Sequence, residues 1–301
     1  MKAYVRLLRP KQWAKNLLIF AAILFTNGFH DRSAVLHVLA AFFAMCALSS
    51  GVYVFNDLHD VEKDRAHPQK KNRPIASGVV KPAQAIALGV LCVLIGVILV
   101  AFLGKKVIAV VLSYLILQLA YNFGGKLVPV LDVFLIGSGF VLRAVLGAAA
   151  INVKISAWLV LCTGALALML GFAKRRHEFI VQGENRTASR ASLGGYSQQS
   201  LDALVIMTST AAALCYGLYA LESPTAQKYP ALFFTTIFVF YGICRYVLIV
   251  FVNDAGGEPE NVLFRDRHVL LSVVLFILAA LVAINVSTLP LIDLSRVGGI
   301  R

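Results

Sequence analysis

Four oxygen-bearing side chains stand at the end of a long apolar stretch and have the types that bind a metal. They are Asn56, Asp57, Asp60 and Asp64. If the chain is helical here, a turn of about 100° per residue places all four within an arc of about 100° on one face. Oxygen ligands without histidine or cysteine suit Mg²⁺, which usually shares its coordination shell with water and substrate phosphates.

The same four residues could instead form a solvated acidic helix end with basic neighbours. Their one-sided face and their position next to an apolar stretch favour the metal site. A basic stretch follows, with Lys70, Lys71 and Arg73 before Pro74. These positive groups could bind phosphate next to the metal or could only set the membrane orientation, and charge alone does not decide between the two.

Membrane-spanning helices are the elements that must position this group. Of the 301 residues, 59% are hydrophobic and 14% are charged, and the formal net charge is +13. Ordinary globular domains carry roughly 25% charged residues, so this composition excludes a disordered chain, a coiled coil and a conventional soluble enzyme. Apolar windows of about 20 residues predict nine spans, at 13–29, 33–55, 83–103, 107–123, 130–151, 155–172, 200–221, 230–252 and 269–289.

The expected fold class is an all-α integral membrane protein that forms a single polytopic domain over 1–301. Its two longest polar stretches, 56–82 and 173–199, fall on the same side of the membrane. That side carries most of the lysines and arginines, so the positive-inside rule places it and the N-terminus inside. We interpret the first apolar stretch as a retained span and not as a cleaved signal.

Two arginines, Arg143 and Arg245, fall inside predicted spans. A buried arginine needs a partner, and the sequence around Arg245 identifies none. The five cysteines lie within apolar runs and have no close pairing, which favours packing over disulfide bonds or metal binding.

The acidic group and the basic stretch together resemble the first signature of the UbiA-type prenyltransferases. The matching pattern is Asn56-Asp57-x-x-Asp60-x-x-x-Asp64, followed by Arg73-Pro74-Ile75-Ala76-Ser77-Gly78. The resemblance implies a fold of nine transmembrane helices around a central cavity. It also implies that the Asn and Asp residues bind Mg²⁺-diphosphate.

The second signature of that family, an Asp-rich motif after the fourth span, is present only in an altered form. Here Tyr121 and Lys126 precede a single acid, Asp132. This variant, together with the stretches 9–16 and 174–178, is similar to the branch of the family that transfers phosphoribose to a polyprenyl phosphate. That resemblance covers nearly the whole chain.

The branch implies a Mg²⁺-dependent glycosyltransferase of the bacterial plasma membrane, with its active site on the cytoplasmic side. The donor would be 5-phosphoribosyl-1-pyrophosphate, and the acceptor would be decaprenyl phosphate or a related polyprenyl phosphate. The lipid phosphate would attack the anomeric carbon, and pyrophosphate would leave. Because the acceptor is already an anion, positioning and charge compensation can suffice without a strong general base. The product would be a precursor of lipid-linked arabinofuranose for cell-envelope glycans.

The resemblance also implies roles for individual residues. Those expected to hold Mg²⁺ are Asn56, Asp57, Asp60, Asp64 and Asp132. Those expected to bind substrate are Lys15, Arg73, Tyr121, Lys126, Asp132, Lys174 and Arg175. Asp57, Asp60 and Lys126 are expected to be catalytic. Alternatives stay open: Tyr121 could be an interfacial aromatic residue, Asp132 could interact with a helix dipole, and the basic residues could only set the orientation.

Two other functions remain as alternatives. A UbiA-type enzyme that moves a prenyl group from prenyl diphosphate to an aromatic acceptor would share the fold and the metal site, but the missing second DxxxD motif counts against it. A transporter or a lipid-phosphate-binding protein without chemistry is disfavoured by the one-sided loops and the acidic group. Nucleic-acid binding is not expected because no basic soluble domain is present. The oligomeric state stays open, with a homo-oligomer as one outcome.

Overall fold

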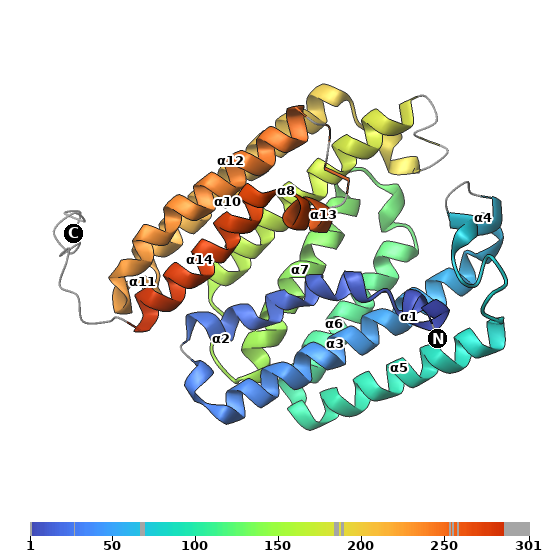
Figure 1. Ribbon diagram of the computed structural model, residues 1–301, viewed down its shortest axis with the longest axis horizontal. Coiled ribbons are helices and arrows are strands. Elements are labelled where there is room, and N and C mark those ends of the chain that lie inside the picture. Colours follow the sequence, from blue (N-terminus) through green and yellow to red (C-terminus); the bar gives the residue numbers. More distant parts are fainter. Residues whose placement is uncertain are drawn as a thin grey trace. The chain divides into compact units, whose positions relative to one another are not determined.

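A computed structural model gives the fold and describes residues 2–26, 28–66, 70–183, 187, 190–252, 254, 256–257 and 259–285. Helices are the only regular elements in this part of the chain (Figure 1). With η marking 3₁₀-helices, the order is α1 (Lys2–Leu8), η1 (Pro10–Phe20), α2 (Ala21–Phe25), η2 (Gly28–His30), α3 (Arg32–His59), α4 (Val61–Ala66), η3 (Lys70–Asn72), α5 (Pro82–Leu103), α6 (Lys105–Asn122), η4 (Gly125–Leu127), α7 (Leu131–Ala150), α8 (Ala157–Gln182), η6 (Ala191–Gly195), α10 (Gln198–Glu222), α11 (Pro224–Lys228), η7 (Pro230–Thr235), α12 (Thr236–Val252), α13 (Pro259–Arg265) and α14 (Arg267–Asn285).

Eight of the described helices are long and apolar enough to cross a membrane. They are α3, α5, α6, α7, α8, α10, the joined η7 and α12, and α14. Each overlaps one of the predicted spans, although the predicted end of the last one, 286–289, lies outside the described residues. The chain is therefore a multi-pass membrane protein built from helices.

The span predicted at 13–29 is not confirmed as a ninth long helix. This stretch forms η1, then the short α2, and then η2. A 3₁₀-helix aligns side chains three residues apart, and Trp13, Asn16 and Ile19 form such a row. Trp13 Nε1 donates to Ser50 Oγ at 3.0 Å, and Asn16 Nδ2 donates to Cys46 Sγ at 3.2 Å. The bonds of Trp13 and Asn16 hold this side of η1 against α3.

Side-chain caps fix where several long helices begin. Asp31 accepts from the backbone N–H of Ser33 at 2.8 Å and starts α3, and Ser156 accepts from Trp158 at 3.2 Å and starts α8. Ser197 accepts from the N–H of Ser200 at 3.1 Å, while the Ser200 hydroxyl accepts from the N–H of Ser197 at 3.0 Å. These bonds satisfy N–H groups that the first helical turn leaves unpaired.

The contacts divide the chain into two compact units, and neither is a continuous stretch of sequence. The first unit comprises the described residues of 1–23, 31–112 and 146–154, and the second those of 24–30, 113–145 and 155–301. The single domain expected over 1–301 stays a prediction.

In the first unit, α3 and α5 pack along much of their length (Figure 1). Small residues allow the approach: a Cβ at Gly51 would lie 2.8 Å from Val93 Cγ2, and one at Gly96 would lie 2.5 Å from Leu48 Cγ. Close packing over small residues is the usual way for helices to associate in a membrane, where apolar surface alone gives little attraction.

Gly147 of α7 provides the closest approach in this unit, against the backbone of η1. A Cβ at this position would overlap the carbonyl oxygen and carbonyl carbon of Ile19, which cannot rotate away. We expect Gly147→Ala to lower the free energy of unfolding by about 1–3 kcal/mol. Thermal unfolding of the detergent-solubilised protein measures this. The control is Gly164→Ala in α8, where the nearest atom would be 3.6 Å away; equal unfolding midpoints for both variants would contradict the expectation.

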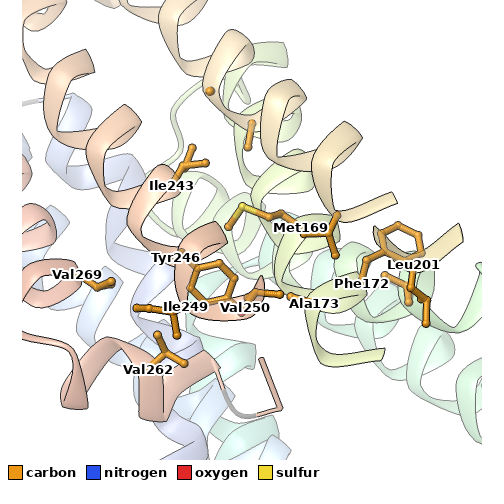
Figure 2. Packing of buried hydrophobic residues seen from close by; sticks show 14 of the residues in the cluster. Met169, Phe172, Ala173, Leu201, Ile243, Tyr246, Ile249, Val250, Val262 and Val269 are labelled. Carbon is orange, nitrogen blue, oxygen red and sulfur yellow. The ribbon is translucent and has the colours of Figure 1, made fainter. Parts of the chain in front are cut away.

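In the second unit, α8, α10, α12, α13 and α14 share one apolar core, which Figure 2 shows from close by. The labelled side chains are Met169, Phe172, Ala173, Leu201, Ile243, Tyr246, Ile249, Val250, Val262 and Val269. This core holds the polar end of α8 in place. The predicted polar stretch 173–199 is therefore partly helical, because α8 continues to Gln182. A helix that leaves the apolar region need not end there.

The two arginines within predicted spans have partners in the second unit. Arg143 donates to the carbonyl of Gly139 at 2.7 Å and to the Tyr114 hydroxyl at 3.1 Å, and its guanidinium lies 4.9 Å from the Tyr114 ring centre. Arg245 pairs with Asp266, whose Oδ2 lies 2.8 Å from Nη2. Asp266 is 21 residues away in the sequence, which explains why the neighbourhood of Arg245 did not reveal it.

The Arg245–Asp266 ion pair is expected to make the stability of the folded protein vary with pH in the acidic range. The hydrogen bond from Arg245, with further bonds from the N–H groups of Val269 and His268, lowers the pKa of Asp266 from 3.8 to about 2. A lowered pKa in the folded state means that this stabilisation is complete above about pH 4 and is lost as the pH falls toward 2. We expect Asp266→Asn to unfold at a lower temperature than wild type at pH 7. The difference in unfolding temperature should become smaller below pH 4. A difference that does not change with pH would show that the ion pair is not its cause.

Candidate functional site

The first group of functional side chains lies where α3 ends and α4 begins. Asp60 separates the two helices with φ −94° and ψ 11°. The helical bonding pattern nevertheless continues through it: the N–H of Asp60 donates to the carbonyl of Asn56 at 2.9 Å, and that of Asp64 to the carbonyl of Asp60 at 2.8 Å. The helix expected through this stretch is thus nearly continuous, and Asp57 and Asp64 are two turns apart on it.

Asp57 and Asp64 are paired with two arginines, and we call these four residues the Asp57 cluster. The two acids are 4% and 3% exposed. Arg73 Nη1 lies 3.0 Å from Asp57 Oδ1 and 2.6 Å from Asp64 Oδ2. Arg9 Nη2 lies 2.6 Å from Asp57 Oδ1. Two negative and two positive charges balance, which makes burial of the two carboxylates tolerable.

Local structure explains how Arg73 reaches the acids. The N–H of Arg73 donates to the carbonyl of Lys70 at 2.9 Å, and the carbonyl of Arg73 accepts from Ser77 at 2.9 Å, so the chain turns here. Ile75 is buried in an apolar cluster with Leu7 and Val54. The side chain of Ile75 therefore anchors the turn next to α3.

Arg9 was not expected as a site residue from the sequence. It precedes Pro10 and has a left-handed backbone with φ 54°, a conformation that is unfavourable for a bulky residue. Its guanidinium lies 4.9 Å from the ring centre of Tyr53, a cation–π contact. It falls in the stretch 9–16 noted above, but no spacing rule relates it to Asp57, which is 48 residues further along.

The oxygen donors of this region fit a hard divalent cation by their chemistry. No three His, Cys, Asp or Glu side chains in the described ranges are grouped closely enough to hold a metal. The ion pairs, however, use only Oδ1 of Asp57 and Oδ2 of Asp64. Asn56 and Asp60 are half-buried, and no side-chain bond to another described residue engages either one. An amide and three carboxylates without nitrogen or sulfur ligands form a set suited to Mg²⁺.

Lys15 belongs to the same unit and lies half-buried on η1. It has contacts of its own. Its role in substrate binding stays a prediction.

A second group of functional side chains surrounds Asp132, in the first turn of α7, which is fully buried. Its Oδ1 accepts from the Tyr196 hydroxyl at 3.3 Å, and its Oδ2 accepts from the Ser192 hydroxyl at 3.1 Å. Arg190 Nη1 and Arg175 Nε each lie 3.5 Å from Oδ2, although the Arg175 Nε–H is not aligned for a hydrogen bond.

Glu178 completes this second group. It forms an ion pair with Arg175, and Arg190 Nε lies 3.4 Å from its Oε2. Arg190 also donates to the Tyr121 hydroxyl at 3.1 Å. The Asp132 cluster, as we call it, consists of Tyr121, Asp132, Arg175, Glu178, Arg190, Ser192 and Tyr196. Its two acids and two arginines again balance in charge.

Burial keeps the hydroxyl of Tyr196 protonated. Loss of solvent is the largest cause that raises the pKa of Tyr196 to about 12, and the neighbouring Asp132 raises it further, while the bond from the Val130 N–H acts in the opposite direction. The neutral hydroxyl can therefore donate to Asp132 across the whole physiological pH range.

The contacts of Asp132 bear on its expected role as a metal ligand or a substrate-binding residue, which stays a prediction. A metal ligand or a ribose-binding group must offer a carboxylate oxygen to the ligand. Both oxygens of Asp132 already accept from protein hydroxyls, and two guanidinium groups lie beside Oδ2. Asp132 thus lies beside Arg175 and Arg190, and the interaction with the helix dipole alone does not explain its burial. The sequence did not assign Arg190, Ser192, Tyr196 or Glu178 to the site.

Two further expected residues lie in the second unit. Lys126 is on η4 and is half-buried, and its ammonium forms no bond with the residues described. Lys174 is on α8, half-buried, and has contacts. Arg175 follows Lys174 directly and precedes the buried Arg176, and it forms an ion pair with Asp132. Substrate binding by Lys126 and Lys174 stays a prediction.

Comparison with known proteins identifies the fold and the family. The family model described as the UbiA prenyltransferase family matches residues 17–262. A decaprenyl-phosphate phosphoribosyltransferase from Mycolicibacterium smegmatis is 34% identical over 277 residues, which cover 87% of this chain and 86% of the relative. An enzyme of the same name from Corynebacterium glutamicum is 34% identical over 269 residues, covering 87% of this chain and 81% of the relative.

A solved structure has the same fold. The structure of a UbiA homolog from Archaeoglobus fulgidus bound to GPP and Mg²⁺ superposes with a TM-score of 0.72 at 18% identity, and the match covers 94% of this chain and 100% of that chain. The resemblance read from the two signatures is confirmed by these matches. The chain belongs to the UbiA prenyltransferase family.

Proposed function

We propose that the protein transfers 5-phosphoribose from 5-phosphoribosyl-1-pyrophosphate to decaprenyl phosphate or a related polyprenyl phosphate. The observation that carries this function is the 34% identity to decaprenyl-phosphate phosphoribosyltransferases over 87% of the chain. The protein is then a pentosyltransferase. The alternative is prenyl transfer, the activity after which the wider family is named.

The reaction exchanges one phosphate for another at the anomeric carbon of ribose. The bond from this carbon to pyrophosphate breaks, and its electron pair leaves with pyrophosphate. An oxygen of the lipid phosphate forms the new bond to the same carbon. Because the nucleophile is already an anion, the protein must chiefly hold two anionic reactants together and stabilise the leaving group.

Residues of and around the Asp57 cluster would hold a divalent metal for this purpose. Asn56, Asp57, Asp60 and Asp64 supply oxygen donors only, which suits Mg²⁺. When bound, the metal would add positive charge at the leaving pyrophosphate. Arg73, 29% exposed, is placed to reach an anion next to the acids.

The Asp132 cluster would bind an anionic part of a substrate through its guanidinium groups. Asp132 and Glu178 fix the orientation of Arg175 and Arg190, and fixed guanidinium groups bind phosphate with good geometry. Arg190 keeps 25% of its side chain exposed, so one side of it remains available. Lys126 would add a further charge that no protein group neutralises in the described structure.

The segment 10–25 would serve as a ninth span despite its 3₁₀ form. Eleven residues of η1 at about 2.0 Å and five of α2 at about 1.5 Å per residue would rise roughly 30 Å if straight, close to the ~30 Å hydrocarbon core. We place the ends of α3 and α8 that carry the two clusters on the cytoplasmic side of a bacterial plasma membrane, since the positive charges of the loops gather there.

A direct assay tests the function. Purified protein with Mg²⁺, radiolabelled 5-phosphoribosyl-1-pyrophosphate and decaprenyl phosphate is expected to yield a labelled lipid and free pyrophosphate, and chelation of the metal should stop both. A parallel reaction with a prenyl diphosphate and an aromatic acceptor is expected to yield nothing. Prenyl transfer without lipid-linked phosphoribose would overturn the proposal in favour of the wider family activity.

A further inference from the structure

One guanidinium nitrogen touches both buried acids of the Asp57 cluster. Arg73 Nη1 lies 3.0 Å from Asp57 Oδ1 and 2.6 Å from Asp64 Oδ2. The same two acids are the buried members of the group Asn56, Asp57, Asp60 and Asp64. Arg73 therefore supplies the positive charge that a divalent metal would otherwise bring to them.

The charge balance makes simple addition of a metal unfavourable. With Arg9 and Arg73 in place, the two buried acids are already neutralised, so a divalent cation would be attracted by the charge of Asp60 alone and would meet two nearby positive groups. Like charges a few ångströms apart in a poorly solvated site repel strongly. Tight metal binding thus requires one arginine to leave.

Arg73 is the arginine that can leave. Arg9 is held from a second side by the ring of Tyr53, at 4.9 Å. The side chain of Arg73 has only its two carboxylate partners within the described structure. The two arginines are almost equally exposed, at 27% for Arg9 and 29% for Arg73, so the extra ring contact of Arg9 is what distinguishes them. Arg73 lies on a turn, so its guanidinium can move toward solvent without disturbing the packing of α3.

We propose that Arg73 is an exchangeable counter-ion that couples metal binding to donor binding. Without metal it neutralises Asp57 and Asp64, and when metal and donor bind together it moves to the diphosphate of the donor. The identity of that donor rests on the proposed function. Because such coupling is reciprocal, the metal and the diphosphate each raise the affinity for the other. Arg73 is then a positioning residue that prevents the site from binding a metal tightly before the donor arrives.

Metal binding without any donor tests this role. Mn²⁺ is the probe, and the signal of free Mn²⁺ in electron paramagnetic resonance measures its binding to the full chain in detergent. Arg73→Gln is expected to bind Mn²⁺ about tenfold more tightly than wild type, within the usual 5–150-fold range of coupling between sites. Arg73→Lys keeps a positive charge in a single small group, so its Mn²⁺ affinity should rise less. This variant provides the measurement if Arg73→Gln folds poorly.

Arg65→Gln is the matched control. Arg65 lies next to Asp64 in α4 and pairs with Glu62 at 3.1 Å, not with the buried acids. The same charge is lost at nearly the same place, so Mn²⁺ affinity should stay at the wild-type value. Unchanged or weaker Mn²⁺ binding in both Arg73 variants would overturn the proposal and make Arg73 a permanent structural partner.

Adding pyrophosphate separates coupling from simple competition. In wild type, preformed Mn²⁺-pyrophosphate is expected to bind at least about tenfold more tightly than Mn²⁺ alone, and the difference should shrink in Arg73→Gln. An equal difference in both proteins would contradict the transfer of Arg73 to the diphosphate. These results do not depend on the acceptor: if lipid-linked phosphoribose never forms but the Mn²⁺ results hold, the proposed function fails and the counter-ion role stands.

Discussion

Replacement of Asp60 by Asn should reduce turnover at least about 100-fold and leave the unfolding temperature unchanged. Asp60 is half-buried at the junction of α3 and α4, and no other described residue forms an ion pair with it. The amide has the same shape but lacks the negative charge that a metal ligand needs. Loss of one well-placed charge of this kind commonly costs two or more orders of magnitude in rate. Initial rates of lipid-linked phosphoribose formation, with unfolding in detergent measured in parallel, check both parts.

The control for Asp60 is Glu62→Gln in α4. Glu62 is 82% exposed and pairs only with Arg65 among the residues described, and a solvated pair of this kind contributes little. We expect nearly wild-type turnover. If Asp60→Asn were as active as Glu62→Gln, the assignment of Asp60 to the metal would be wrong.

Replacement of Asp132 by Asn should have the largest effect on stability, about 3–5 kcal/mol of the free energy of unfolding. Asp132 is fully buried, and Arg175, at 1% exposure, lies beside it. An asparagine leaves the guanidinium groups with one counter-ion, Glu178, and an uncompensated buried charge is costly. Turnover should also fall, because Arg175 and Arg190 lose their fixed orientation. Chemical denaturation of the solubilised protein measures the first effect, and the transferase assay measures the second.

Two further variants test whether lost charge compensation causes the destabilisation by Asp132→Asn. Ser192→Ala removes one neutral hydrogen bond to Asp132 and should cost only about 1 kcal/mol. Combining Asp132→Asn with Arg190→Gln removes one positive charge as well, so it should be less destabilised than the sum of the single changes. Strict additivity would show that charge compensation is not what Asp132 provides.

The membrane helices were predictable from the sequence because their signal is long and local. Windows of apolar residues located eight of the helices, although the window for α8 ended at 172 and the helix continues to Gln182. The segment after Pro10 was misjudged as an ordinary long helix, and bonds of Trp13 and Asn16 hold its 3₁₀-helix against α3. Such contacts join distant parts of the chain and leave no periodic pattern in the segment itself.

The candidate site was only partly predictable for a related reason. Helical spacing alone predicts that four residues group on one face, and these are Asn56, Asp57, Asp60 and Asp64. The partners of Asp132 come from two separate segments, α8 and 190–196, and Ser192 is 60 residues away. The charge of Arg190 could equally have set the membrane orientation, so only the folded structure distinguishes it from other loop arginines.

The contact between Gly147 and Ile19 also constrains how the protein is made. Ile19 of η1 is synthesised well before Gly147, which belongs to α7. The N-terminal segment therefore cannot reach its final packing until α7 has been inserted. Until then, its contacts are limited to segments made earlier, such as α3 and α5. The N-terminal segment thus reaches its final packing only after α7 has been made, and nascent chains that stop before α7 should leave it open to proteases or cross-linkers.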